Sequence, residues 1–322
     1  MKKIIVIAGI MVLPWLTACR DGGGGDPLPQ PGAAVHLEGS IGMSTRGVIG
    51  SGYDKDLELG FARRDETAGA PGTYGAWTVC EAVRQGGAGS RPITFTQPQL
   101  YPEDGRRISL HGYYPAGAES DADPQTGKTL FYIDGATDIL ATGCLTASVY
   151  NPVRSCTLRH LLTQVALVCY SDRPEQWGTV MKIEAAGIPL AQELDWQQET
   201  PQLVAAFGSP VGKVEVQDIA GLVLPQAGGA EYLPEAQGYI LLPVSSSDGT
   251  TSSPLQLEVT TSKDGRGVET PTLSQVSVSV EGGFQAGSRH QISLFFTEGC
   301  QIEAVSVSVE QWTDRETVEL PL

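Results

Sequence analysis

Several residue types and motifs are scarce or missing in this chain of 322 residues. Asparagine occurs once, as Asn151, and a proline follows it, so the sequence has no acceptor site for N-glycosylation. Neither the Gly-x-Ser-x-Gly turn of serine hydrolases nor the His-Glu-x-x-His helix of zinc proteases occurs. Basic residues are few: 21 Lys and Arg stand against 37 Asp and Glu, and the net charge of −16 argues against nucleic acid as a partner.

Histidine is also rare, and the four present are far apart in the sequence. They stand in unrelated strand-like contexts without the spacing of metal ligands, which predicts structural roles for His36, His111, His160 and His290. Pairs of acidic residues lie in turn-rich segments, where solvation is their usual role. We therefore predict no catalytic residue, no metal site and no cofactor, and we expect that the chain is not an enzyme.

One segment, residues 122–129, fits a relaxed phosphate-loop pattern, with alanine at the position of the first glycine. A phosphate loop needs a buried strand before it and a helix after it, so that backbone amides face the phosphate. Here the strand-like residues 130–133 follow the loop. A hairpin turn containing proline and glycine is the better interpretation.

The cysteines predict little covalent cross-linking. After Cys19 the chain has Cys80, Cys144, Cys156, Cys169 and Cys300. An exported chain can form disulfides, but an odd number leaves at least one thiol unpaired. Positions 156 and 169 would be tens of ångströms apart in an extended strand, at about 3.3 Å per residue, against a limit near 7 Å for a bridge. Cys144 and Cys156 either pair across the turn at Asn151 or are small buried thiols, and both alternatives stay open.

The first residues predict export. Lysines at positions 2 and 3 precede an almost uninterrupted apolar run over residues 4–13, which is typical of a secretory signal over residues 1–18 and too short for a spanning helix of about 20 residues. The sequence Leu-Thr-Ala-Cys at positions 16–19 resembles a lipobox. That resemblance implies cleavage before Cys19 and a lipid on its thiol; the alternative is an ordinary exported protein with a free thiol. Residues 19–35 hold four consecutive glycines and several prolines, which predicts a flexible tether.

From residue 36 onward the chain is punctuated like an all-β protein. Short runs of alternating apolar and polar residues recur between clusters of Gly, Pro, Asp and Ser. The clearest are residues 255–259, 276–280 and 305–310, whose alternation puts the apolar side chains on one face of a sheet. Val305, Val307 and Val309 share a parity that Trp312 does not, so a bulge near Gln311 would bring all four to one face.

Residues 157–170 fit both helical and strand spacing, and the β-branched residues among them favour one strand with a buried second half. Turn residues follow at 171–174, and the strand-like residues 182–189 come after them. We therefore predict an N-terminal domain over residues 36–172 and a C-terminal domain over residues 173–322.

Seven short motifs follow one another along most of the chain. They are Ser44-Thr45-Arg46, RISLHGYYP at 107–115, DILAT at 138–142, LRHLLTQV at 158–165, GYILLP at 238–243, FQAGSRHQISL at 284–294 and the late Trp312. Together they resemble the fimbrillin and minor-fimbrillin-like family of pilus lipoproteins from Bacteroidales. Each motif alone is degenerate, and their order carries the resemblance.

The resemblance implies two β-sandwich, transthyretin-like domains in tandem behind the signal peptide and tether. It implies a subunit, tip adhesin or anchor of a pilus, or fimbria, that is exported as a lipoprotein to the outer membrane and cell surface. Members of the family assemble by donor-strand exchange, in which an extended segment of one subunit pairs with an open sheet edge of the next. The implied partners are other pilin subunits, the membrane through the lipid on Cys19, and a ligand on a host or bacterial surface.

In polymerising members of the family a trypsin-like protease cuts after an arginine near the first strand. Arg46 matches that position, because it follows the strand-like residues 36–45. Arg63, Arg64 and Arg84 are competing cleavage points in predicted loops. The resemblance leaves open whether Arg46 is cut, since anchor and some tip subunits are not processed.

The candidate donor is the C-terminal strand, residues 302–312 with the tail 313–322, through Val305, Val307, Val309 and Trp312. The alternative for the same residues is an ordinary last strand of the second sandwich. A second functional class also stands, namely a surface lipoprotein that binds a glycan or protein without polymerising. Trp77, Trp177 and Trp196 could stack on sugars, although core packing is the commoner role.

Overall fold

The computed structural model describes residues 32–42, 49–227, 235–244, 249–263 and 272–311. Within them the chain is built almost entirely from strands, with one short helix, α1 (Pro174–Trp177), and one 3-10 turn, η1 (Gly117–Glu119). The all-β prediction is confirmed. None of the helices among these residues is long and apolar enough to cross a membrane. The predicted signal peptide lies outside the described residues.

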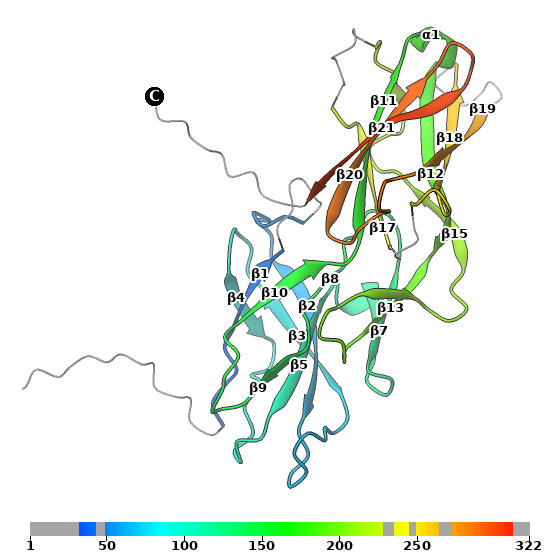
Figure 1. The fold of residues 1–322 in the computed structure, drawn as a ribbon. Helices are drawn as coiled ribbons and strands as arrows, with labels where there is room; N and C mark the ends of the chain where they lie inside the picture. The colour runs from blue at the N-terminus through cyan, green and yellow to red at the C-terminus, as the bar shows by residue number, and fades with distance from the viewer. Residues whose placement is uncertain (1–31, 43–48, 228–234, 245–248, 264–271, 312–322) are drawn as a thin grey trace, which may run out of the picture.

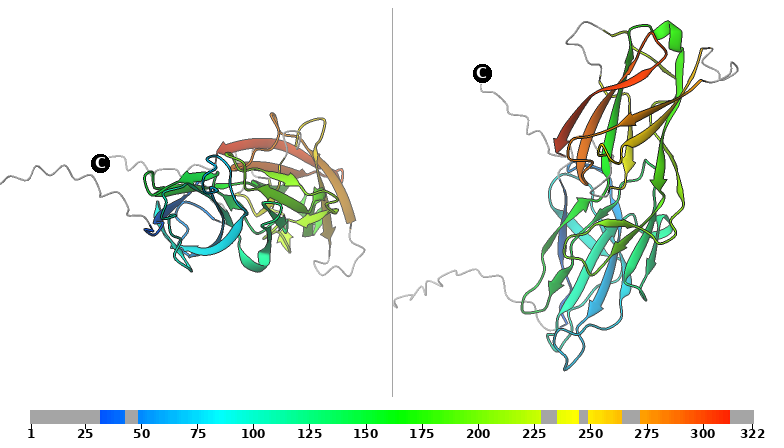
Figure 2. Two further views of the ribbon diagram at one scale, coloured as in Figure 1. Left: turned by 90° about the horizontal axis from the view of Figure 1, so that it is seen from below. Right: turned by 45° about the vertical axis from the view of Figure 1, so that its right-hand side comes forward.

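The strands of the N-terminal half form a closed barrel, which Figure 2 shows end-on. In order around it they are β2 (Leu57–Asp65), β3 (Thr78–Arg84), β4 (Arg91–Phe95), β1 (Leu37–Ile41), β10 (Ser155–His160), β8 (Leu140–Ala141) and β5 (Ile108–Tyr114). One edge of β5 pairs with β2, which closes the ring, and its other edge pairs with β8 and with β9 (Leu145–Ala147). A closed sheet buries the same alternating faces as two stacked sheets, so the strand pattern does not separate a barrel from the expected sandwich.

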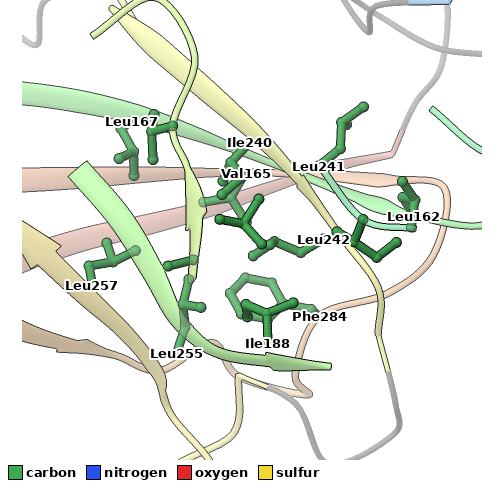
Figure 3. Packing of buried hydrophobic residues seen from close by; sticks show 14 of the residues in the cluster. Leu162, Val165, Leu167, Ile188, Ile240, Leu241, Leu242, Leu255, Leu257 and Phe284 are labelled. Carbon is green, nitrogen blue, oxygen red and sulfur yellow. The ribbon is translucent and has the colours of Figure 1, made fainter. Parts of the chain in front are cut away.

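The C-terminal half is a sandwich of two facing sheets. The first sheet has the order β17 (Gly238–Leu242), β11 (Thr163–Ser171), β20 (Ser288–Phe296) and β21 (Ile302–Gln311). The second has the order β15 (Val211–Glu215), β12 (Thr179–Pro189), β18 (Leu255–Ser262) and β19 (Thr272–Val278), and β16 (Leu222–Val223) also pairs with β12. Alternate residues of both sheets meet between them, as Figure 3 shows for Val165, Ile240 and Leu257.

A third, smaller sheet, which we name the side sheet, lies against the barrel. It consists of β6 (Ser120–Asp123), β7 (Lys128–Tyr132), β13 (Ala191–Asp195) and β14 (Leu203–Ala205). The β6–β7 hairpin pairs Asp123 with Lys128 and turns at Gly127, whose φ is 72°. This confirms the hairpin interpretation of residues 122–129. Trp77 and Trp196, with ring centroids 5.4 Å apart, pack in the seam between barrel and side sheet.

Residues 157–170 form two strands that belong to different sheets. The preference for strand over helix is confirmed, but the prediction of a single strand is wrong: β10 ends at His160 in the barrel and β11 begins at Thr163 in the sandwich. Leu161 and Leu162 between them are both buried, which a continuous alternating strand with one solvated face does not allow. The boundary predicted between residues 172 and 173 stays a prediction, and β13 pairs with β7 across it.

Candidate functional site: the seat of the first strand and the last strand

The first strand, β1, is one of the strands that form the wall of the barrel (Figure 1). It has 5 residues and pairs with β10 in parallel on one side and with β4 antiparallel on the other. Leu37, Gly39 and Ile41 face the barrel interior, and Glu38 and Ser40 face outward. Because both edges of β1 are hydrogen-bonded, its departure would leave unpaired backbone groups on β4 and on β10.

A buried arginine holds the middle of β1. Arg84, the last residue of β3, is fully buried, and its Nε donates a hydrogen bond of 2.8 Å to the carbonyl oxygen of Gly39. Its Nη1 and Nη2 donate to the carbonyl oxygens of Gln85, Gly87 and Gly89 at 3.0, 3.1 and 2.8 Å. Burial lowers the pKa of Arg84 from its usual value. The guanidinium therefore fastens β1 to the loop that follows β3.

Asp138 and His160 form a buried clamp at the end of β1. Oδ2 of Asp138 lies 2.7 Å from Nδ1 of His160, and Nε2 of His160 lies 3.1 Å from the carbonyl oxygen of Gly42. A carbonyl oxygen only accepts, so Nε2 carries the hydrogen there. The contact between Nδ1 and the carboxyl group then needs a second proton on one of the two groups. Gly42 is also held through its own N–H, which donates to the carbonyl oxygen of Leu158 at 2.7 Å.

The last described strand, β21, is an edge strand of the sandwich, drawn in red in Figure 1. Among the strands described here it is hydrogen-bonded to β20. Val305 and Val309 are 54% and 51% exposed, although both are apolar. An edge strand with exposed apolar side chains presents unpaired backbone groups and a surface that another chain can cover.

The end of β21 lies close to the end of β1. Gln311 is paired with Ser288, the first residue of β20. The Ser288 carbonyl oxygen accepts a hydrogen bond of 3.1 Å from Oγ1 of Thr163, and the N–H of Gly287 donates to the carbonyl oxygen of Leu162 at 2.9 Å. These contacts fall within three residues of His160, which holds Gly42. The end of β1 and the end of β21 therefore meet where β10 passes into β11.

The predicted donor residues are partly placed by the structure. Val305, Val307 and Val309 lie in β21, whereas Trp312 lies outside the described residues. The prediction of one shared face is wrong for Val305, because the register shifts between Ser293 and Leu294 and leaves Val305 unmatched there. A bulge therefore lies at Val305, and the bulge predicted near Gln311 stays a prediction because Trp312 is not among the described residues. Cys19 and Arg46 also lie outside the described residues.

The three competing arginines do not lie in loops, so that prediction is wrong. Arg63 and Arg64 are in β2, and Arg84 ends β3. Arg63 forms an ion pair of 2.9 Å with Asp65, and the guanidinium of Arg64 lies 4.3 Å from the ring centroid of Trp77. Arginines whose backbone is paired in a sheet and whose side chains are held in this way are poor protease sites.

The cysteines and tryptophans have structural roles. All five described cysteines are free, so the disulfide between Cys144 and Cys156 is wrong. Burial raises the pKa of Cys156 and of Cys169 to about 12, which keeps both as thiols. The tryptophans considered for sugar stacking are all buried, namely Trp77, Trp177 and Trp196.

A cavity of about 740 Å³ lies beside the start of β1. It is bordered by β1 itself, by β4 and by the segment before β10, and its lining includes His36, Glu38, Pro92, Tyr101, Pro152 and Arg154. Among the described residues, no group of three or more His, Cys, Asp or Glu side chains is placed to hold a metal ion.

The sequence matches no protein-family model and no curated protein. Several solved structures share its fold. A protein from Bacteroides uniformis, described as a candidate cell adhesion protein, is 14% identical with a TM-score of 0.55, over 87% of this chain and 98% of its own. A second such protein, from Bacteroides ovatus, has a TM-score of 0.54 and the same identity and coverage. A protein from Bacteroides vulgatus described as fimbrial is 13% identical with a TM-score of 0.50, over 86% of this chain and 99% of its own. At these identities the likeness establishes the fold.

Proposed function

We propose that the chain is a fimbrial subunit or a tip or anchor adhesin that is assembled by donor-strand augmentation. In this proposal it is exported as a lipoprotein and held on the outer membrane by a lipid on Cys19, and it has no catalytic role. The observation that carries the proposal is the place of β1 between β4 and β10, which we name the seat of β1. There a short strand is hydrogen-bonded on both edges inside a barrel that is otherwise continuous. The shared fold with proteins described as candidate adhesion and fimbrial proteins supports it.

The energetics of β1 suit a strand that is exchanged. Its interior side chains are Leu37 and Ile41, and burying a side chain of this size stabilises by about 1.5–3 kcal/mol. While the chain is intact, β1 is covalently joined to the barrel. After a cut at Arg46 these side chains, the ladder hydrogen bonds, Arg84, the His160 clamp and the backbone hydrogen bonds of Ala33 and Val35 would retain it. An incoming strand that makes the same contacts could then replace it at little net cost.

The donor in this proposal is the C-terminal strand. β21 contributes one edge of a sheet and has its other edge open among the described strands, so it can be withdrawn without dividing the sandwich. Its exposed Val305 and Val309 would be covered in a neighbouring subunit. A strand that serves in both places must fit its own domain first, as β21 does by pairing along its whole length with β20.

The test is exchange of β1 in the full chain after treatment with an arginine-specific protease. We expect the cut chain to take up a labelled peptide of residues 35–42 and to release its own β1, and we expect Arg46→Ala to do neither. Arg106→Ala is the matched control, because Arg106 lies in a loop, and its loss should leave the uptake of peptide unchanged. A wild-type chain that keeps residues 46 and 47 joined, or that takes up no peptide after the cut, would contradict the proposal.

A second candidate function is a surface lipoprotein that binds a glycan or a protein without polymerising. It is favoured by Phe207, a fully exposed aromatic side chain at the turn after β14, and by the cavity beside β1. This function predicts a monomer at all concentrations and a glycan-array signal that Phe207→Ser removes. Exchange of β1 for the peptide of residues 35–42 in the cut chain would exclude it.

A further inference from the structure

The seat of β1 is narrow at its centre. A Cβ atom at position 39 would lie 2.6 Å from Cδ1 and 3.2 Å from Cγ1 of Ile93, and 3.7 Å from Cδ of Arg84. Carbon atoms in van der Waals contact are about 3.5–4.0 Å apart. The side chain of Ile93 therefore occupies the space into which a side chain at this position would point, and Arg84 lies beside it at contact distance.

The side chains of Ile93 and Arg84 are themselves held in place. Ile93 is buried and lies opposite Leu37 on one side and Arg84 on the other. Arg84 is held by hydrogen bonds to backbone carbonyl oxygens, one of them that of Gly39 itself. A valine at position 39 would add two further methyl groups in the same direction, so Ile93 would have to leave its rotamer inside a closed barrel.

The positions two residues away on either side are different. Leu37 and Ile41 are both buried, and their side chains occupy the barrel interior beside residues such as Ile93 and Leu158. The interior face of the seat therefore has a fixed pattern: a large apolar side chain, then no side chain, then a large apolar side chain, at alternate positions of one strand.

The chain's own last strand does not have this pattern. Residues 302–311 contain no glycine. If the odd positions of β21 faced the barrel interior, Val307 would stand at the centre between Val305 and Val309. If the even positions faced inward, Ala304 would stand between Ile302 and Ser306, so that one large side chain is missing and a Cβ is still present.

We propose that the seat of β1 selects an incoming strand with glycine between two large apolar residues, and that it excludes β21 of a second copy of this chain. The partner that fills the seat is therefore a different subunit, whose donated segment has the pattern large-x-Gly-x-large. This inference rests on the proposed function. It specifies which partner strand the seat of β1 accepts.

The width of the seat can be tested in the intact chain by urea unfolding. We expect Gly39→Val to lower the folding equilibrium constant by at least about tenfold, the usual scale of overpacking in a closed core. Ile93→Ala in the same chain should recover part of that loss by making room. Glu38→Val is the matched control, since Glu38 faces outward on the same strand and its change should have a much smaller effect. Equal effects of Gly39→Val and Glu38→Val would overturn the inference.

The selection itself is tested with labelled peptides. A site for a sequence-specific protease is inserted after Arg46 in the full chain, which is folded and then cut, so that the test does not depend on natural processing. The peptides carry residues 35–42, the same residues with valine in place of Gly39, and residues 302–311. We expect the first peptide to enter the barrel, measured by fluorescence anisotropy, and the other two to bind at least about tenfold more weakly. Ile93→Ala should improve entry of the valine peptide only.

The outcomes separate the inference from the proposed function. If the valine peptide or the β21 peptide enters as well as the glycine peptide, strand exchange stands and the selection is refuted. If even the peptide of residues 35–42 fails to enter the cut chain, β1 is not exchangeable. The proposed function then falls, and the selection with it.

Discussion

Acid should weaken the seam between the barrel and the side sheet, because His111 is buried there without a charge. His111 lies in β5, opposite Ala62 of β2, and is fully buried. Burial lowers the pKa of His111 from 6.5 to about 4, while the charge of Asp195 acts in the opposite direction. Asp195 is the last residue of β13 and its charge favours protonation of His111, whereas burial in the seam opposes it.

The magnitude follows from the two pKa values. An unfolded histidine titrates near pH 6.5, so between about pH 6.5 and pH 4 the unfolded chain binds a proton that the folded chain does not. Stability is therefore fully present above pH 6.5 and falls as the pH decreases through this window. At 1.36 kcal/mol per pKa unit the loss from His111 is about 3 kcal/mol.

The assay is urea unfolding of the full chain at about pH 7 and about pH 4, compared with His111→Gln. Glutamine does not titrate, so the variant should lose about 3 kcal/mol less than the wild type between the two pH values. The pKa of His290 is also lowered by burial, but His290 is present in both proteins and its contribution cancels in the comparison. Equal losses in the two proteins would refute the assignment of His111 as the acid-sensitive group.

Three further results are expected. His160→Phe should lower the free energy of unfolding in urea by about 3–5 kcal/mol, because it leaves the buried Asp138 unpaired. Adding Asp138→Leu should recover part of this loss. A His160→Phe variant as stable as the wild type would contradict the clamp. Cys300 is exposed and should react with iodoacetamide in the folded chain, whereas Cys169 should react only after unfolding, as mass spectrometry of peptides would show; equal rates would contradict the burial of Cys169. Val305→Ser should change the free energy of unfolding in urea by less than about 0.5 kcal/mol, because Val305 is 54% exposed at the edge of the sandwich, and a loss of more than about 1 kcal/mol would contradict that exposure.

Strand positions were predictable because alternation survives in the sequence. Residues 255–259 lie within β18, and residues 305–310 lie within β21. The closure of the barrel was not predictable in this way. It depends on β5 pairing with β2 along one edge and with β8 along the other, and these partners are set by long-range contacts that leave no periodic signal.

Glycines within the strands carry information that a search for alternation overlooks. A Cβ at Gly60 would overlap the ring of Tyr113, and a Cβ at Gly112 would lie 2.8 Å from the ring of Phe61. Each glycine makes room for an aromatic ring of the paired strand, as Gly39 makes room for Ile93. A glycine inside a strand-like run was therefore the signal that could have located the seat of β1.

Two features of the candidate site gave no local signal. Arg84 resembles an ordinary surface arginine in the sequence, and its burial depends on three carbonyl oxygens of the loop after β3 and on that of Gly39 in β1. Asp138 and His160 both stand in motifs that resemble the fimbrillin family, but they are joined only because β10 and the segment before β8 are neighbours in the barrel. Contacts of this kind follow from the fold and cannot be read from residue types.

The junction between β10 and β11 explains how the departure of β1 can affect β21. Departure of β1 would remove Gly42 from His160 and Leu158, both in β10. The next residues, Leu162 and Thr163, hold the start of β20, to which β21 is paired. A strand that loses a neighbour at one end of a continuous run shifts or loosens the residues that follow, because backbone order is shared along the run. The seat of β1 and the strand β21 are therefore linked through four consecutive residues, 160–163. Substitutions there should alter both the retention of β1 and the pairing of β21 with β20.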